Sequence, residues 1–293
     1  MRLVSDYMKD DMLRHELNIL TDKTFGFDFE NWYRNGYFEG EYIPYSFEEN
    51  GSIISNVSAN HMYFNIAGEK KYFIQIGTVM TDEAYRNQGL ARQLIKAVIK
   101  EYEGRCDGIY LFGNLSALNF YRKAGFVEKN QYQYSLKDKA VIAKKSGGMF
   151  IKTNAGTDPE MKKKYLAAVR EGAANSAFEQ ENRFSLQMFY TADMDNVYYS
   201  KELDCFAVYS VDDGVLTLQS VISNRKQQLR DVIGEIRDEY KKLVLGFTPD
   251  DDSKDLFDAT KFDGGDDYRL FCLGSGMDVI ERDRLFFPAL SHA

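Results

Sequence analysis

The stretch from Tyr72 to Phe126 constrains the fold of this chain more than any other. An apolar run from Tyr72 to Met80 is followed by a short polar turn, after which apolar residues recur every three or four positions up to Tyr102. A short apolar run is typical of a buried strand, and the later spacing is typical of an amphipathic helix. The sequence therefore predicts a strand, a loop and a helix in direct succession.

The loop between this strand and this helix has the composition of an anion-binding turn. Small residues stand at positions 89 and 91, where larger side chains would shield the backbone N–H groups. The first N–H groups of a helix have no partner within the helix, and the helix dipole makes that end positive. Such an end suits a pyrophosphate, beside which Arg86 adds a positive charge. The alternative is an ordinary turn with a packing glycine.

A second unit of strand and helix follows the first. Ile109 to Phe112 form a short apolar run, and either Asn114 or Ser116 can cap the next helix. Gly125 can end that helix in a left-handed conformation.

In this order the two motifs resemble the GNAT superfamily of N-acetyltransferases. The first motif is R-x-x-G-x-A at Arg86, Gly89 and Ala91, and the second is N-x-x-A-x-x-x-Y-x-x-x-G-F from Asn114 to Phe126. The resemblance implies the GNAT fold, an α/β (α+β) arrangement with a mixed, mostly antiparallel sheet flanked by helices. It also implies acetyl-CoA as the cosubstrate.

The same resemblance assigns the site residues. Main-chain groups at the end of the first strand are expected to hold the pantetheine, the loop to hold the pyrophosphate, and Asn114 either to hold the pantetheine arm or to cap its helix. Tyr121 is expected beside the sulfur as the general acid, with a core tyrosine as the alternative. The expected coenzyme-binding residues are Val79, Met80, Thr81, Arg86, Asn87, Gln88, Gly89, Leu90, Ala91 and Asn114.

The acceptor site and the general base are left open by the sequence. By the resemblance, an aromatic segment after the first helix walls the acceptor site, although its rings can equally be core residues: Phe27, Trp32, Tyr33, Tyr37 and Phe38. Deprotonating an amine of pKa about 10.4 at pH 7 costs roughly 4.6 kcal/mol, so a base is useful. The candidates are Glu39, Glu41, Glu48, Glu49 and the terminal carboxylate.

The second half resembles a worn copy of the first. It repeats two strands (Cys205–Val211 and Leu216–Ser223), a helix from Leu229 to Tyr240 and a strand from Leu243 to Phe247. Phe257 to Phe262 can be laid on Tyr121 to Phe126. The loop before the repeated helix contains no glycine, so we expect the second half to bind no coenzyme.

These features predict a tandem GNAT arrangement. Residues 1–137 form a catalytic domain that ends with a strand at residues 131–136, and residues 138–293 form a degenerate GNAT-like domain with a strand at residues 268–273. The polar segment 137–148 reads as the linker. Eis-like acetyltransferases have a similar pair of modules plus a further domain that is not expected here. Their terminal carboxylate reaches the active site, whereas plain packing is the favoured interpretation for Ala293.

Composition narrows the function further. The 45 acidic residues exceed the 37 basic ones, which gives a formal charge of −8, so a nucleic-acid partner is not expected. Dispersed cysteines and histidines predict no metal site, and no signal peptide or membrane-spanning run is recognised. We expect a cytoplasmic N-acetyltransferase that acts on a primary amine of a small molecule or peptide. The alternative is a non-catalytic acyl-CoA-binding sensor or scaffold, and the oligomeric state stays open.

Overall fold

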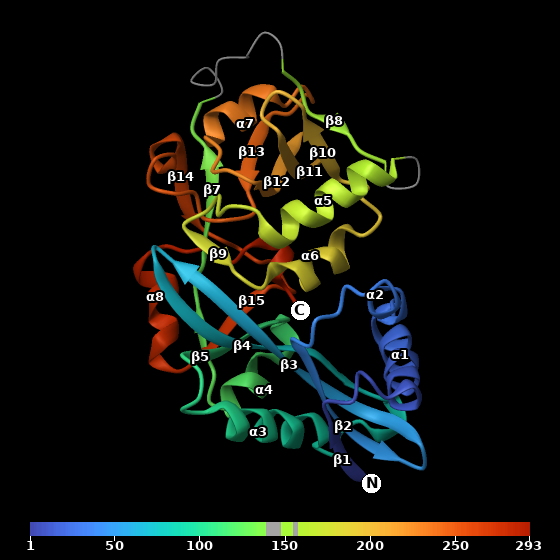
Figure 1. The fold of residues 1–293 in the computed structure, drawn as a ribbon. Helices are drawn as coiled ribbons and strands as arrows, with labels where there is room; N and C mark the ends of the chain where they lie inside the picture. The colour runs from blue at the N-terminus through green and yellow to red at the C-terminus, as the bar shows by residue number, and fades with distance from the viewer. Residues whose placement is uncertain (139–147, 155–157) are drawn as a thin grey trace.

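The computed structural model describes residues 1–138, 148–154 and 158–293, so most of the expected linker lies outside the described residues. The described chain forms two β-sheets (Figure 1). The strands of the first sheet are β1 (Arg2–Ser5), β2 (Tyr42–Glu49), β3 (Ser52–Ile66), β4 (Glu69–Thr81), β5 (Gly108–Gly113), β6 (Val127–Lys129), β9 (Phe178–Gln180) and β15 (Arg269–Leu273). The strands of the second sheet are β7 (Tyr132–Leu136), β8 (Ile151–Lys152), β10 (Val197–Ser200), β11 (Cys205–Asp212), β12 (Val215–Ser223), β13 (Lys242–Leu245) and β14 (Phe257–Lys261).

Both sheets are mixed and mostly antiparallel. The first has the order β1-β2-β3-β4-β5-β15-β6, with β9 paired to β3, and the second has the order β14-β7-β13-β12-β11-β10-β8. The parallel pairs are β4 with β5 and β12 with β13. The expected α+β architecture with two GNAT-like sheets is confirmed.

Helices cover both faces of the sheets and join the two halves. They are α1 (Asp11–Phe25), α2 (Glu30–Arg34), α3 (Leu90–Tyr102), α4 (Leu118–Lys123), α5 (Pro159–Glu171), α6 (Arg183–Thr191), α7 (Leu229–Glu235) and α8 (Val279–Arg282). α3 and α4 pack on the first sheet, and α7 packs on the second. Residues of α1, α2, α5 and α6 share one hydrophobic core, so the two halves are packed against each other.

Local signals place several elements correctly. α3 spans Leu90 to Tyr102 as its apolar spacing predicts, and Leu94, Ile95 and Val98 are buried against the sheet. The sequence Ser58-Ala59-Asn60 has the composition of a turn, but β3 continues through these residues paired with β4. Asn60 is buried there, and its amide donates to the carbonyl of Gln75 at 3.0 Å. A turn-like composition at this point therefore serves hydrogen bonds within the sheet.

The two halves exchange strands, which the sequence does not predict. β7 lies between β13 and β14 of the second sheet, and β15 lies between β5 and β6 of the first. The residues 131–136 therefore do not close the first sheet, and residues 268–273 do not belong to the second. Leu270, Phe271 and Cys272 of β15 are buried in the first half, which explains the insertion. Neither predicted range, 1–137 or 138–293, holds every strand of one sheet.

The second half departs from the first more than its sequence suggests. α7 ends at Glu235, well before Tyr240, and residues 257–261 form strand β14 rather than a counterpart of α4. β14 pairs with β7 along its whole length, from Phe257 opposite Leu136 to Lys261 opposite Tyr132. No helix in the described part of the chain is long and apolar enough to cross a bilayer.

Candidate functional site

The parallel strands β4 and β5 separate in the middle of the first sheet. They pair only from Phe73 to Gln75 and from Gly108 to Tyr110. Beyond that point β5 continues beside β15, and β4 continues beside β3. Among the described residues, β4 therefore has no paired strand on its β5 side from Ile76 to Thr81. Main-chain groups without a strand partner are available to a ligand.

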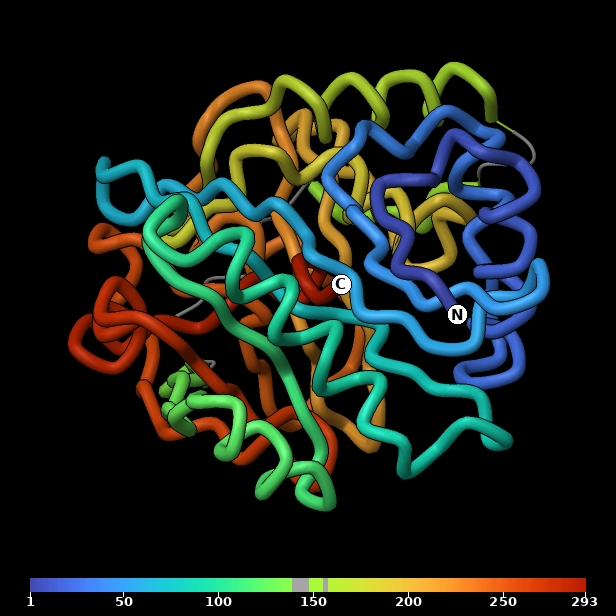
Figure 2. Tube along the Cα trace, turned by 90° about the horizontal axis from the view of Figure 1, so that it is seen from below, coloured from blue at the N-terminus to red at the C-terminus, as the bar shows by residue number. Residues whose placement is uncertain are grey.

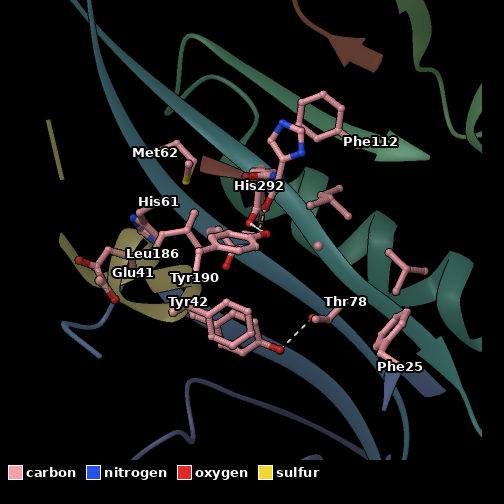
Figure 3. Close-up of a pocket in the computed structure, with 18 of the residues that line it drawn as sticks. Phe25, Glu41, Tyr42, His61, Met62, Thr78, Phe112, Leu186, Tyr190 and His292 are labelled. Atoms are coloured by element: carbon pink, nitrogen blue, oxygen red, sulfur yellow. Dashed lines mark hydrogen bonds between the residues drawn. The ribbon is translucent and has the colours of Figure 1, made fainter. Parts of the chain in front are cut away.

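A bulge in β4 lies at this separation. The register between β3 and β4 shifts between Asn56 and Ser58, and Thr78 has a φ of 40°. Left-handed backbone is costly for a β-branched residue, so its surroundings must hold it. The buried Asn56 amide donates to the Thr78 carbonyl at 3.0 Å, and the hydroxyls of Tyr42 and Thr78 share a hydrogen bond of 2.8 Å (Figure 3). These contacts fix the direction of the strand end.

A cavity of about 680 Å³ opens beside the separated strands. Both halves of the chain line it, and Figure 2 shows the C-terminus in the middle of the molecule, where the tail reaches this cavity. Its walls include Trp32, Tyr42, Val79, Tyr121, Phe189 and Ala293. The cavity therefore joins the end of β4 to residues of α2, α4, α6 and the C-terminal tail.

The loop before α3 has the geometry of an anion site. Gly89 has a φ of 76°, and a Cβ built there would meet no atom within 4 Å. Gly89 is also the N-cap of α3, where no side chain caps the first turn. Asn87 has a φ of 64°, and the exposed Arg86 lies 3.3 Å from Glu83. The free helix end and the open space at Gly89 fit a pyrophosphate.

The remaining loop positions differ in what they can contact. Leu90 is buried in the core under the first sheet, and Ala91 is half-buried, so the side chain of Leu90 contributes packing. Gln88 is exposed. None of the residues 86–91 lines the cavity, which begins further back along β4.

The strand residues chosen from the sequence are only partly at the cavity. Val79 lines it, whereas the carbonyl of Met80 accepts a hydrogen bond from Ser55 at 3.0 Å and the carbonyl of Thr81 accepts one from Arg86 at 3.4 Å. Ile76, Gly77 and Thr78 line the cavity instead and were missed. Gly77 could have been found from the sequence, because a glycine inside a strand often marks a bulge or a close backbone approach.

Tyr121 and Asn114 both lie at the cavity wall. Asn114 caps the turn before α4, because its Oδ1 accepts from the N–H of Ala117 at 3.0 Å. Tyr121 lies against β5, where a Cβ on Gly113 would be 2.7 Å from its ring. Burial raises the pKa of Tyr121 to about 12, so its hydroxyl keeps its proton at neutral pH.

Two of the five expected aromatic residues, Phe27 and Trp32, line the cavity. Trp32 is held by a hydrogen bond of 2.8 Å from its indole N–H to the carbonyl of Ser185 on α6. Tyr33, Tyr37 and Phe38 pack in or against the shared core outside the lining. These three residues therefore do not line the cavity, and their packing fits the alternative that they are core residues.

The candidate bases separate by position. Glu39 pairs with Arg170 and Glu48 with Arg2, and neither lines the cavity, nor does Glu49. Glu41 does line it, and burial raises the pKa of its carboxyl. The main chain of Ala293 lies against β4, since a Cβ on Gly77 would be 2.4 Å from its oxygen. The tail therefore reaches the cavity instead of only packing between the halves.

Comparisons with known proteins agree with this geometry. Residues 8–126 match the model of the Acetyltransferase (GNAT) family. A probable N-acyltransferase of unknown function from Enterococcus faecalis V583 has a similar structure, with a TM-score of 0.57 and 16% sequence identity over 92% of this chain and 72% of that one. A GCN5-related N-acetyltransferase from Anabaena variabilis is also similar, with a TM-score of 0.54 and 14% identity over 92% of this chain and 72% of that one. Another, from Kribbella flavida, has a TM-score of 0.53 and 16% identity over 92% of this chain and 70% of that one.

No curated protein matches the chain. The identities to the solved structures are low, so those likenesses support the fold alone. The family match therefore applies to residues 8–126, which resemble the acetyltransferase (GNAT) family, and the solved structures share the two-sheet fold of the described chain.

Proposed function

We propose that the protein is an acetyl-CoA-dependent N-acetyltransferase that transfers the acetyl group to a primary amine of a small molecule or peptide by direct attack. The observation that carries the proposal is the separation of β4 from β5 beside a cavity of about 680 Å³ with Tyr121 in its wall. The family match over residues 8–126 supports it.

The first half offers groups for each part of the donor substrate. Acetyl-CoA brings an acetyl group activated as a thioester. The free N–H groups of the first turn of α3, with Arg86 beside them, would hold its pyrophosphate. The main chain of β4 from Ile76 to Val79 would hold the pantetheine and face the thioester carbonyl. Most of the rate would then come from positioning the two reactants.

Tyr121 would act on the departing sulfur. Its pKa of about 12 lies well above that of a thiol, about 8.5, a difference on the order of 5 kcal/mol against full proton transfer. The hydroxyl therefore contributes mainly as a hydrogen-bond donor to the thiolate, and the proton arrives as the thiolate becomes solvated. This role needs the protonated phenol, which burial preserves.

The proposal is tested by incubating the protein with acetyl-CoA and a panel of amines while following the release of free thiol. We expect release that depends on an added amine and exceeds the hydrolysis measured without one. Isothermal titration with acetyl-CoA alone measures binding separately. Tight coenzyme binding with no amine-dependent release across the panel would favour the non-catalytic acyl-CoA-binding sensor or scaffold.

A further inference from the structure

The charges at the cavity wall select against an acidic acceptor. Glu41 and Asp267 line it, and the described lining contains no lysine or arginine. Burial lowers the pKa of His61 and lowers that of His292 to about 4, so both rings are neutral at pH 7. A carboxylate or phosphate on the acceptor would find no cationic partner there. Burying an unpaired charge is costly, so such acceptors are disfavoured.

The apolar wall of the cavity is built from interlocked rings. Phe189 of α6 contacts the rings of Phe27 at 5.4 Å, Phe29 at 6.0 Å and Trp32 at 6.0 Å, measured between ring centroids. All four residues line the cavity. Rings packed edge to face hold one another in place and offer a fixed apolar surface. This surface suits a ligand whose body is apolar and of the size of a ring.

Two buried polar atoms of the lining make no hydrogen bond of ordinary length within the described structure. They are Glu41 Oε2 and Ser185 Oγ, and Ser185 lies close enough to Glu41 to act on the pKa of its carboxyl, against the larger effect of burial. Both residues line the cavity, and the carbonyl of Ser185 is already occupied by Trp32. Figure 3 shows Glu41 on the opposite side of the pocket from Thr78 and Phe25. Buried polar groups nearly always have a partner, so a hydrogen-bond donor on a ligand fits here.

We propose, building on the acetyltransferase function above, that the acceptor is a primary amine on an apolar, ring-sized body without an acidic group, whose far end donates a hydrogen bond to Glu41. The amine reacts at the Thr78 side of the cavity, and its body lies along the wall formed by Trp32 and Phe189. The nitrogen of the ammonium loses one proton to solvent and bonds to the acetyl carbon while the C–S bond breaks. The nitrogen then loses a second proton, and the thiolate takes up a proton to become the thiol of CoA.

Matched amines test this assignment. Tyramine and phenethylamine differ by one hydroxyl donor, and tyrosine differs from tyramine by one carboxylate. We expect kcat/KM for tyramine to exceed that for phenethylamine by about ten-fold, on the order of a hydrogen bond to a charged group. Tyrosine should fall about 100-fold or more below tyramine, because its carboxylate is unpaired in the cavity. Binding of each amine in the presence of CoA, measured by calorimetry, should follow the same order.

Two variants connect the preference to Glu41. In Glu41→Gln the advantage of tyramine over phenethylamine should shrink to about two-fold, whereas Glu39→Gln, two residues away and outside the lining, should keep it. An equal loss for both amines in Glu41→Gln would overturn the assigned contact, as would tyrosine reacting as well as tyramine. If no amine causes thiol release but tyramine still binds as described, the acetyltransferase function fails and the recognition site stands.

Discussion

Each half of the molecule contains a pair of parallel strands, but the space beside that pair is used differently in the two halves. In the first sheet the separation of β4 from β5 leaves a cavity. In the second sheet β12 and β13 pair in parallel from Val215 to Leu218, and the space beyond holds the chain's own tail. The N–H of Ala289 donates to the carbonyl of Gly246 at 2.7 Å, and a Cβ on Gly246 would lie 2.9 Å from that of Ala289.

The loops that precede α3 and α7 also differ in whether their polar groups are free or already hydrogen-bonded within the protein. At α3, Gly89 faces open space. At α7, the N–H of the buried Gln227 donates to Asn175 Oδ1 at 2.8 Å, and the carbonyl of Ser223 accepts from Ala173 at 2.8 Å. The rear loop thus uses its polar groups within the protein. Similar topology does not preserve a binding site when side chains and the tail occupy it, and the expectation that the second half binds no coenzyme stays a prediction with this added physical reason.

The largest effect is expected from a substitution in the loop before α3, in the first half of the chain. Gly89→Glu places bulk and a negative charge where the pyrophosphate is proposed to bind, so the Kd for acetyl-CoA should rise about 100-fold or more. Isothermal titration calorimetry measures it.

Gly104→Glu is the matched control, because Gly104 lies just beyond the other end of α3, has a φ of 75° and likewise has no atom within 4 Å of an added Cβ. Both variants carry the same backbone strain. An equal change in Kd for the two would mean that the loop at Gly89 is only a turn.

A smaller effect is expected at the reacting end of the front site. Tyr121→Phe should lower kcat by about ten-fold or more, in line with the loss of a hydrogen bond to the departing thiolate, and leave the Kd for acetyl-CoA nearly unchanged. Steady-state kinetics and calorimetry measure the two quantities.

The pH dependence sharpens this prediction. Since burial raises the pKa of Tyr121 to about 12, the phenol stays protonated well past the ordinary tyrosine pKa, and the ratio of wild-type to variant kcat should stay constant up to about pH 10. A variant with wild-type kcat would remove Tyr121 from the mechanism.

The smallest effect is expected in the rear half. Gly246→Ala overpacks the contact with Ala289 and with Gln219, whose Cα would be 3.0 Å from the added Cβ. The free energy of unfolding should fall by about 1–3 kcal/mol, measured by urea denaturation, while the Kd for acetyl-CoA stays within about two-fold. A ten-fold weaker coenzyme affinity would contradict the proposed division, because it would show that the rear contact supports the front site.

The sequence by itself determined the local elements of the front half. The apolar spacing predicted α3, and the glycine at position 89 predicted the turn before it. Both predictions succeed because helix period and left-handed backbone depend on neighbouring residues. The cap at Asn114 is local in the same way, whereas the expectation for Tyr121 came from the resemblance to a family.

Only the tertiary structure decided what surrounds these elements. Three features join residues far apart in the chain: the exchange of β7 and β15, the tail that contacts Gly246 beyond β13 and ends against Gly77, and the wall formed by Trp32 with Phe189. Such contacts depend on which buried surfaces fit together, and the apolar pattern of a strand shows that it is buried without showing which sheet buries it.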